Sequence, residues 1–138
     1  MISNKKLGNS FEEELCENLA EKGWWSHNLA QNQVGQPADV LAVKNNIAVL
    51  IDCKVCKNNR FPLSRIEGNQ EGAMTLWRER GNAYCEFALK LDDGDIYMIS
   101  FIRMLELEIK GVKSLSEQDI RKFPTFDRWF SIMEELIC

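Results

Sequence analysis

The chain has 138 residues, of which 45% are hydrophobic and 28% are charged, the composition of one soluble domain large enough to bury a core. No apolar run approaches the length of a membrane span, and residues 1–6 lack the apolar stretch of a signal peptide, so we expect a cytoplasmic protein with no membrane partner. The five cysteines, an odd number, indicate reduced thiols. A net charge of −4 argues against a protein that coats nucleic acids in general.

The first predicted element is a helix that begins at Ser10, because Ser10 and Glu13 form a capping box. Its end is predicted at Gly23. A strand over residues 24–29 and a polar turn over residues 31–37 are expected next. The buried stripe of the helix consists of Phe11, Leu15 and Leu19.

The middle of the chain predicts a β-hairpin. Residues 39–44 and 47–55 have the β-branched and apolar content of strands. Asn45-Asn46 between them is a two-residue turn signal, because Asn tolerates positive φ. The length and apolar content of the second strand predict a central place in the sheet.

The rest of the chain completes an α/β pattern. A loop over 57–60 is expected first, then a helix that follows 61–64 and ends near Gly81, and then strands over 83–90 and 96–100. Three helices are expected after these strands: one over 101–110, a short one after a Ser114…Glu117 capping box, and a last one after Thr125. The order α-β-β-β-α-β-β-α indicates a central mixed β-sheet flanked by helices. With no linker, we expect a single domain over 1–138, with a core at about 8–100 and a helical extension over 101–138.

The candidate chemistry lies in the hairpin, at Asp39, Asp52 and Lys54. Side chains alternate faces along a strand, so Asp52 and Lys54 point the same way, about 7 Å apart, and folding about the turn brings Asp39 to the same end. Two carboxylates can hold a divalent cation, and a nearby ammonium can orient a water molecule. The alternative is structural: Asp39 caps a turn, and Asp52 and Lys54 form an ion pair.

Two helices offer supporting residues. Glu12 either complements the dipole of the first helix or completes the ligand set of a metal. Gln70 is the polar residue of a stripe on the second helix, and is either a structural bridge or an aid to a site residue. That predicted stripe consists of Ile66, Gln70, Ala73 and Trp77. The tryptophans at 24, 25, 77 and 129 are expected in the core rather than as platforms for nucleobases.

The segment after the hairpin is basic. Between Val40 and Ile66 there are five basic residues and one acid, Asp52. The strip supplied by Lys57, Arg60 and Arg65 is a candidate to contact DNA phosphates. Its alternative is an ordinary solvated surface.

Taken together, Glu12, Asp39, Asp52-Cys53-Lys54 and Gln70 resemble the PD-(D/E)xK nuclease superfamily, and within it the RecU-type Holliday junction resolvases of Gram-positive bacteria and their phages. The resemblance runs from about Gly8 to Ser100. Its motifs are Gly8-x-x-Phe11-Glu12-x-x-Leu15, Asp39-x12-Asp52-x-Lys54, Phe61-Pro62-Leu63-x-x-Ile66-x-x-x-Gln70 and the strand within Gly81…Phe87.

The resemblance implies a restriction-endonuclease-like core and a Mg²⁺- or Mn²⁺-dependent DNA endonuclease that works as a homodimer. It implies that Glu12, Asp39 and Asp52 bind the metal, with the Cys53 carbonyl as a further ligand. Lys54 would position the attacking water and Gln70 would support the site. Asp52 stands where these resolvases usually have Glu, Asn69 where they often have His, and residues 30–37 are too short for their stalk. Two alternatives stay open, a nuclease fold that binds DNA or a protein without cutting and a plain structural domain.

Overall fold

The structure, a computed structural model, describes residues 4–29 and 38–137, and side chains from residue 10 onward. The predicted turn over residues 31–37, including Gln36 and Pro37, lies outside the described residues. The elements are α1 (Asn4–Glu21), β1 (Trp25–Asn28), β2 (Val40–Lys44), β3 (Ile47–Val55), η2 (Lys57–Asn59), β4 (Phe61–Pro62), η3 (Leu63–Arg65), α2 (Gly68–Glu79), β5 (Tyr84–Lys90), β6 (Ile96–Ser100), α3 (Phe101–Ile109), β7 (Ser114–Leu115), α4 (Glu117–Ile120) and α5 (Phe126–Ile137).

The main sheet has the order β1-β2-β3-β5-β6, so β3 is central, as predicted. The β3–β5 pair is parallel and the other pairs are antiparallel, which confirms the mixed sheet. The parallel pair requires a crossover, and α2 lies on that connection. The predicted hairpin is present, and its turn residues Asn45 and Asn46 have φ values of 48° and 70°.

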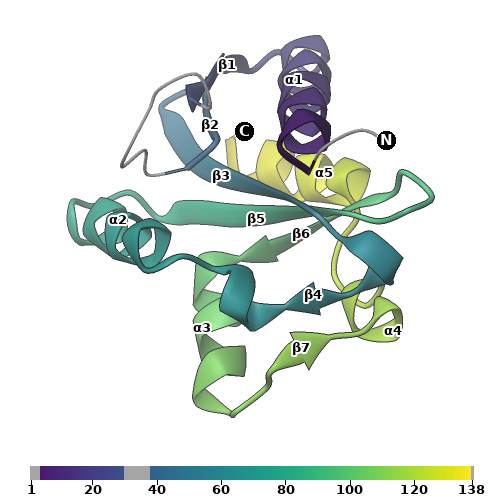
Figure 1. The fold of residues 1–138 in the computed structure, drawn as a ribbon. Helices are drawn as coiled ribbons and strands as arrows, with labels where there is room; N and C mark the ends of the chain where they lie inside the picture. Colours follow the sequence, from purple (N-terminus) through teal and green to yellow (C-terminus); the bar gives the residue numbers. More distant parts are fainter. Residues whose placement is uncertain (1–3, 30–37, 138) are drawn as a thin grey trace.

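Helices cover both faces of this sheet (Figure 1). On one face, α1 contributes the predicted stripe of Phe11, Leu15 and Leu19, and α5 contributes Phe126, Trp129, Phe130 and Met133. On the other face, α2, α3 and α4 pack a second apolar cluster around Phe87 and Leu89 of β5. Residues beyond 100 therefore contribute to the cores on both faces. Within the described residues, no helix is long and apolar enough to cross a membrane.

Two predicted helix starts are wrong. α1 begins at Asn4, so Ser10 lies inside the helix and caps nothing. A Ser followed by Glu three residues later also occurs within helices, and Lys5, Lys6 and Leu7 before it are good helix formers. The second predicted box is displaced, because Ser116 caps α4 with Asp119 as its partner, while Ser114 belongs to β7.

Other differences come from contacts distant in sequence. The pairing of β4 with β7 forms a second, two-stranded sheet that was not predicted, because strands of two residues carry no periodicity. On α2 the buried side chains are Gln70 and Met74. Ile66, Ala73 and Trp77, predicted as that stripe, are half-buried. Trp24 and Trp129 are buried as predicted.

Candidate active site

Asp39, the residue before β2, lies opposite Asp52 of β3. The ladder pairs Val40 with Ile51, so the next position sets Asp39 opposite Asp52. The Asp39 N–H donates to the Ile51 carbonyl at 3.1 Å, and Asp39 Oδ2 accepts a hydrogen bond from the Cys53 N–H at 2.8 Å. Both ends of Asp39 are therefore fixed by the backbone of β3.

Asp52 is completely buried, and its two oxygens have different partners. Oδ1 accepts a hydrogen bond of 2.7 Å from Gln70 Nε2. Oδ2 lies 3.2 Å from Lys54 Nζ, an ion pair whose angles do not make a hydrogen bond. The predicted common face of Asp52 and Lys54 is confirmed.

Gln70 fills both of the roles predicted as alternatives. Its Oε1 accepts a hydrogen bond from Lys54 Nζ at 3.3 Å, while its Nε2 holds Asp52, so one amide joins the acid and the base. The same Oε1 accepts from the Glu67 N–H at 3.4 Å, which completes the capping box of α2. The start of α2 and the position of Lys54 thus depend on one side chain.

Glu12 reaches the same place from α1. It is 6% exposed, and its carboxyl group lies close to that of Asp39. Because α1 begins at Asn4, Glu12 lies well past the first turn, which removes the predicted dipole role. Burial, followed by the charge of Asp39, raises the pKa of Glu12 from 4.5 to about 8.

The same physics acts on Asp52. Burial, followed by the charge of Asp39, raises its pKa well above the usual value, and Lys54 opposes that rise. Glu12 on α1 and Asp52 on β3 therefore both lie close enough to Asp39, the residue before β2, for its charge to raise their pKa values.

A divalent cation suits this donor set. Glu12 Oε2 and Asp52 Oδ2 are buried without a hydrogen-bond partner, and a hard cation on oxygen ligands would satisfy both. Among residues 10–29 and 38–137, no three Asp, Glu, His or Cys side chains are arranged so that they could hold a metal ion. The carboxyl groups therefore fit a cation by the chemistry of their oxygen atoms.

The cysteines near the site are structural. The Cys53 thiol packs into the core beneath α1, so only its carbonyl is left for the predicted metal contact, which stays a prediction. Cys56 lies in the cluster on the opposite face of the sheet. Burial raises the pKa of both thiols, which keeps them protonated.

The predicted DNA strip lies on the connection that follows β3. Lys57, Arg60 and Arg65 are all exposed. Arg65 Nη1 donates to the Val55 carbonyl at 2.7 Å, which holds the guanidinium one residue beyond Lys54. Arg60 Nη2 donates to Ser114 Oγ at 3.1 Å. The structure thus places the strip at the Lys54 end of β3, and its contact with DNA stays a prediction.

One buried acid was not among the predicted site residues. Glu86 on β5 is 8% exposed, and burial raises its pKa to about 7, which its proximity to the Trp129 indole opposes. The sequence carried a signal for it, because Glu86 is an acid within a largely apolar strand, as Asp52 is in β3.

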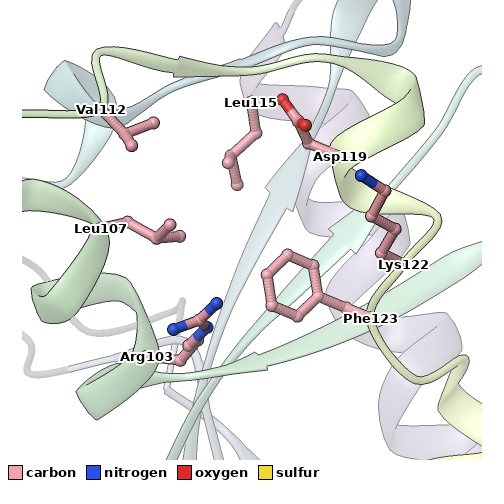
Figure 2. A pocket seen from close by; sticks show the side chains of 7 residues that line it. All are labelled: Arg103, Leu107, Val112, Leu115, Asp119, Lys122 and Phe123. Atoms are coloured by element: carbon pink, nitrogen blue, oxygen red, sulfur yellow. The ribbon is translucent and has the colours of Figure 1, made fainter. Parts of the chain in front are cut away.

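A pocket of about 340 Å³ lies elsewhere, between α3, β7 and α4 (Figure 2). Leu107, Leu115 and Phe123 point into it, and Arg103 and Lys122 stand at its rim. None of the predicted site residues lines this pocket. The carboxyl groups are therefore a separate feature.

Comparisons with known proteins agree with this geometry. The solved structure of Hjc, a Holliday junction resolvase from the archaeal hyperthermophile Archaeoglobus fulgidus, matches with a TM-score of 0.56 and 21% identity over 69% of this chain and 78% of that one, which shows the fold. No curated protein sequence matches the chain. The model of the archaeal Holliday junction resolvase family matches residues 3–125, which supports the predicted resolvase assignment but not its RecU-type or phage part. The chain belongs to the archaeal Holliday junction resolvase (Hjc) family.

Proposed function

We propose that this protein cuts four-way DNA junctions by hydrolysing phosphodiester bonds, with Mg²⁺ or Mn²⁺ as its cation. The observation that carries the proposal is the meeting of three buried carboxyl groups, Glu12, Asp39 and Asp52, beside Lys54. An acidic site beside an ammonium suits the charge that develops on a phosphate during hydrolysis. Membership of a junction-resolvase family supports the choice of substrate.

In this proposal the carboxyl groups and Lys54 have different roles. Glu12, Asp39 and Asp52 would hold the cation, which would supply charge neutralisation at the cleaved phosphate. Lys54, held between Asp52 and Gln70, presents its ammonium where an attacking water can be oriented. As the water oxygen bonds to phosphorus and one ester bond breaks, Lys54 can stabilise negative charge on the phosphate oxygens.

The strip of Lys57, Arg60 and Arg65 would bind phosphates next to the cut, because it starts directly beyond Lys54. A homodimer is the natural assembly, since a junction needs paired cuts related by a twofold axis. Cytoplasmic location and a RecU-type or phage origin stay predictions from the sequence.

A non-cutting DNA-binding module is the second candidate. It is favoured by one observation, that no three Asp, Glu, His or Cys side chains among the described ones are arranged so that they could hold a metal ion. The two functions differ in the fate of the substrate, so one experiment separates them.

The experiment incubates labelled four-way junction, duplex and single-stranded DNA with Mg²⁺ or Mn²⁺. We expect the parent to cut the junction and Asp52→Asn to lose at least a hundredfold in rate, whereas Asp127→Asn, the same change at an exposed position, keeps full activity. Thermal unfolding checks that each variant folds, and Asp39→Asn replaces Asp52→Asn if that variant does not. Binding without cutting by the parent would establish the module instead.

A further inference from the structure

Trp25 is a large exposed side chain close to the candidate active site. It is 60% exposed, so the prediction that it lies in the core is wrong. Its ring stacks with that of His27, the only histidine of the chain, with centroids 6.2 Å apart and planes inclined by 12°. Because the two rings are nearly parallel, they are already oriented to stack with another flat ring.

The strand register shows which face of the sheet carries this pair. Trp25 pairs with Val43 and His27 with Leu41, whereas Val40 and Ala42, the alternate residues of β2, are buried beneath α1. Trp25 and His27 therefore point to the face opposite α1. Asp52 and Lys54 point to this same face, because they alternate with Ile51 and Cys53, which belong to the α1 side.

The same register gives the spacing to the carboxyl groups. His27 lies opposite Leu41, and Asp39 comes two residues before Leu41, so His27 and Asp39 are diagonal neighbours, roughly 7–8 Å apart. Leu41 and Val43 are half-buried and form an apolar floor beside the rings. The rings of Trp25 and His27 thus form a flat platform that begins diagonally next to Asp39, one of the proposed metal ligands.

We propose that Trp25 and His27 stack on an unpaired nucleobase of the DNA strand whose phosphate is bound at Asp39 and Asp52. This inference rests on the proposed function and adds a contact that recognises an open branch point. A base suits the platform because it is flat and uncharged and is tied to a phosphate at the neighbouring site. Base stacking on an aromatic side chain tolerates any sequence, which a junction enzyme requires.

The test compares Trp25→Ala, Trp25→Phe and His27→Ala, with Ile109→Ala as a control at another exposed apolar position. Affinity is measured in EDTA for single-stranded DNA, for a four-way junction with 2-aminopurine at the branch point, and for plain duplex. We expect Trp25→Ala to weaken binding of the first two about five- to hundredfold, with duplex binding unchanged and Trp25→Phe near the parent. The dependence of affinity on salt should keep its slope, because no phosphate contact is lost.

The outcomes separate this inference from the proposed function. If the parent cuts junctions with Mg²⁺ but Trp25→Ala and His27→Ala bind all three DNAs like the parent, the stacking site is refuted and the nuclease stands. If no DNA is cut but the variants lose affinity for unpaired bases only, the stacking site stands without the nuclease. A change in oligomeric state with unaltered DNA affinity would assign Trp25 to contact with a second copy and overturn the proposal.

Discussion

Replacing Glu12 with glutamine tests whether the carboxyl groups form a metal site. Gln has nearly the volume of Glu and keeps the side-chain oxygen, but it cannot be charged. In the folded protein, burial and Asp39 raise the pKa of Glu12 to about 8, against 4.5 in an ordinary setting. The metal-free fold therefore keeps a proton on Glu12 where the unfolded chain has lost it.

The sign and the size of the effect follow from that difference. With the folded pKa raised, the stabilising effect of the proton is complete below pH 4.5 and is lost as the pH rises to about 8. At about 1.4 kcal/mol for each pH unit, the upper limit of this loss is about 5 kcal/mol. Solvent reaching the site reduces it, and we expect Glu12→Gln to be roughly 2 kcal/mol more stable than the parent at pH 8 without metal.

Chemical denaturation between pH 5 and pH 8 in EDTA measures this change, with Glu17→Gln as the control on an exposed position of the same helix. Calorimetry in buffers of different ionisation enthalpy then counts the protons released on Mg²⁺ binding at pH 7. We expect the parent to release about one proton more than Glu12→Gln and to bind the cation more tightly. Equal pH dependence of stability, together with equal proton release, would refute the reasoning.

Three further changes test other parts of the structure. Gln70→Ala should lower kcat by about 10- to 100-fold with little change in KM, because Asp52 and Lys54 lose their shared partner; an unchanged kcat would contradict this. The parent should lose stability as the pH rises from 4.5 to about 7, and Glu86→Gln should remove this loss, as measured by chemical denaturation at several pH values. A pH profile like that of the parent would contradict the buried position of Glu86. Replacing Lys57, Arg60 and Arg65 by Ala should weaken all DNA binding and flatten its salt dependence, and an unaltered slope would exclude the strip from phosphate contact.

The parts of the structure that the sequence predicted correctly depend on local rules. Asn45-Asn46 predicted the hairpin because positive φ suits Asn, and strand alternation then placed Asp52 and Lys54 on one face. The stripe of Phe11, Leu15 and Leu19 predicted the buried side of α1 even though its start was wrong by six residues, Ser10 against Asn4. Side-chain period is a property of the element and survives errors at its ends.

The parts that the sequence could not predict depend on which elements meet. The environment of Trp25 is decided by the edge position of β1, and its neighbour Trp24, with the same side chain, is buried against Trp129. Whether Glu12 complements the helix dipole or belongs to the carboxyl cluster depends on where α1 begins and on how close Asp39 lies to it. Neither fact has a signal within a few residues of the side chain concerned.

The charged form of Glu12 destabilises the packing of α1 on the sheet, because the group is buried close to Asp39. Glu12 lies on α1, which packs through Phe11 and Leu15 on the same face of the sheet that carries Cys53, so the apolar contacts bring its carboxyl group close to Asp39. The apolar contacts of α1 thus stabilise its packing on the sheet, and the repulsion between Glu12 and Asp39 destabilises the same packing. A cation that neutralises the carboxylates removes this repulsion, so metal binding should stabilise the packing of α1 more than that of α3, which carries no site residue.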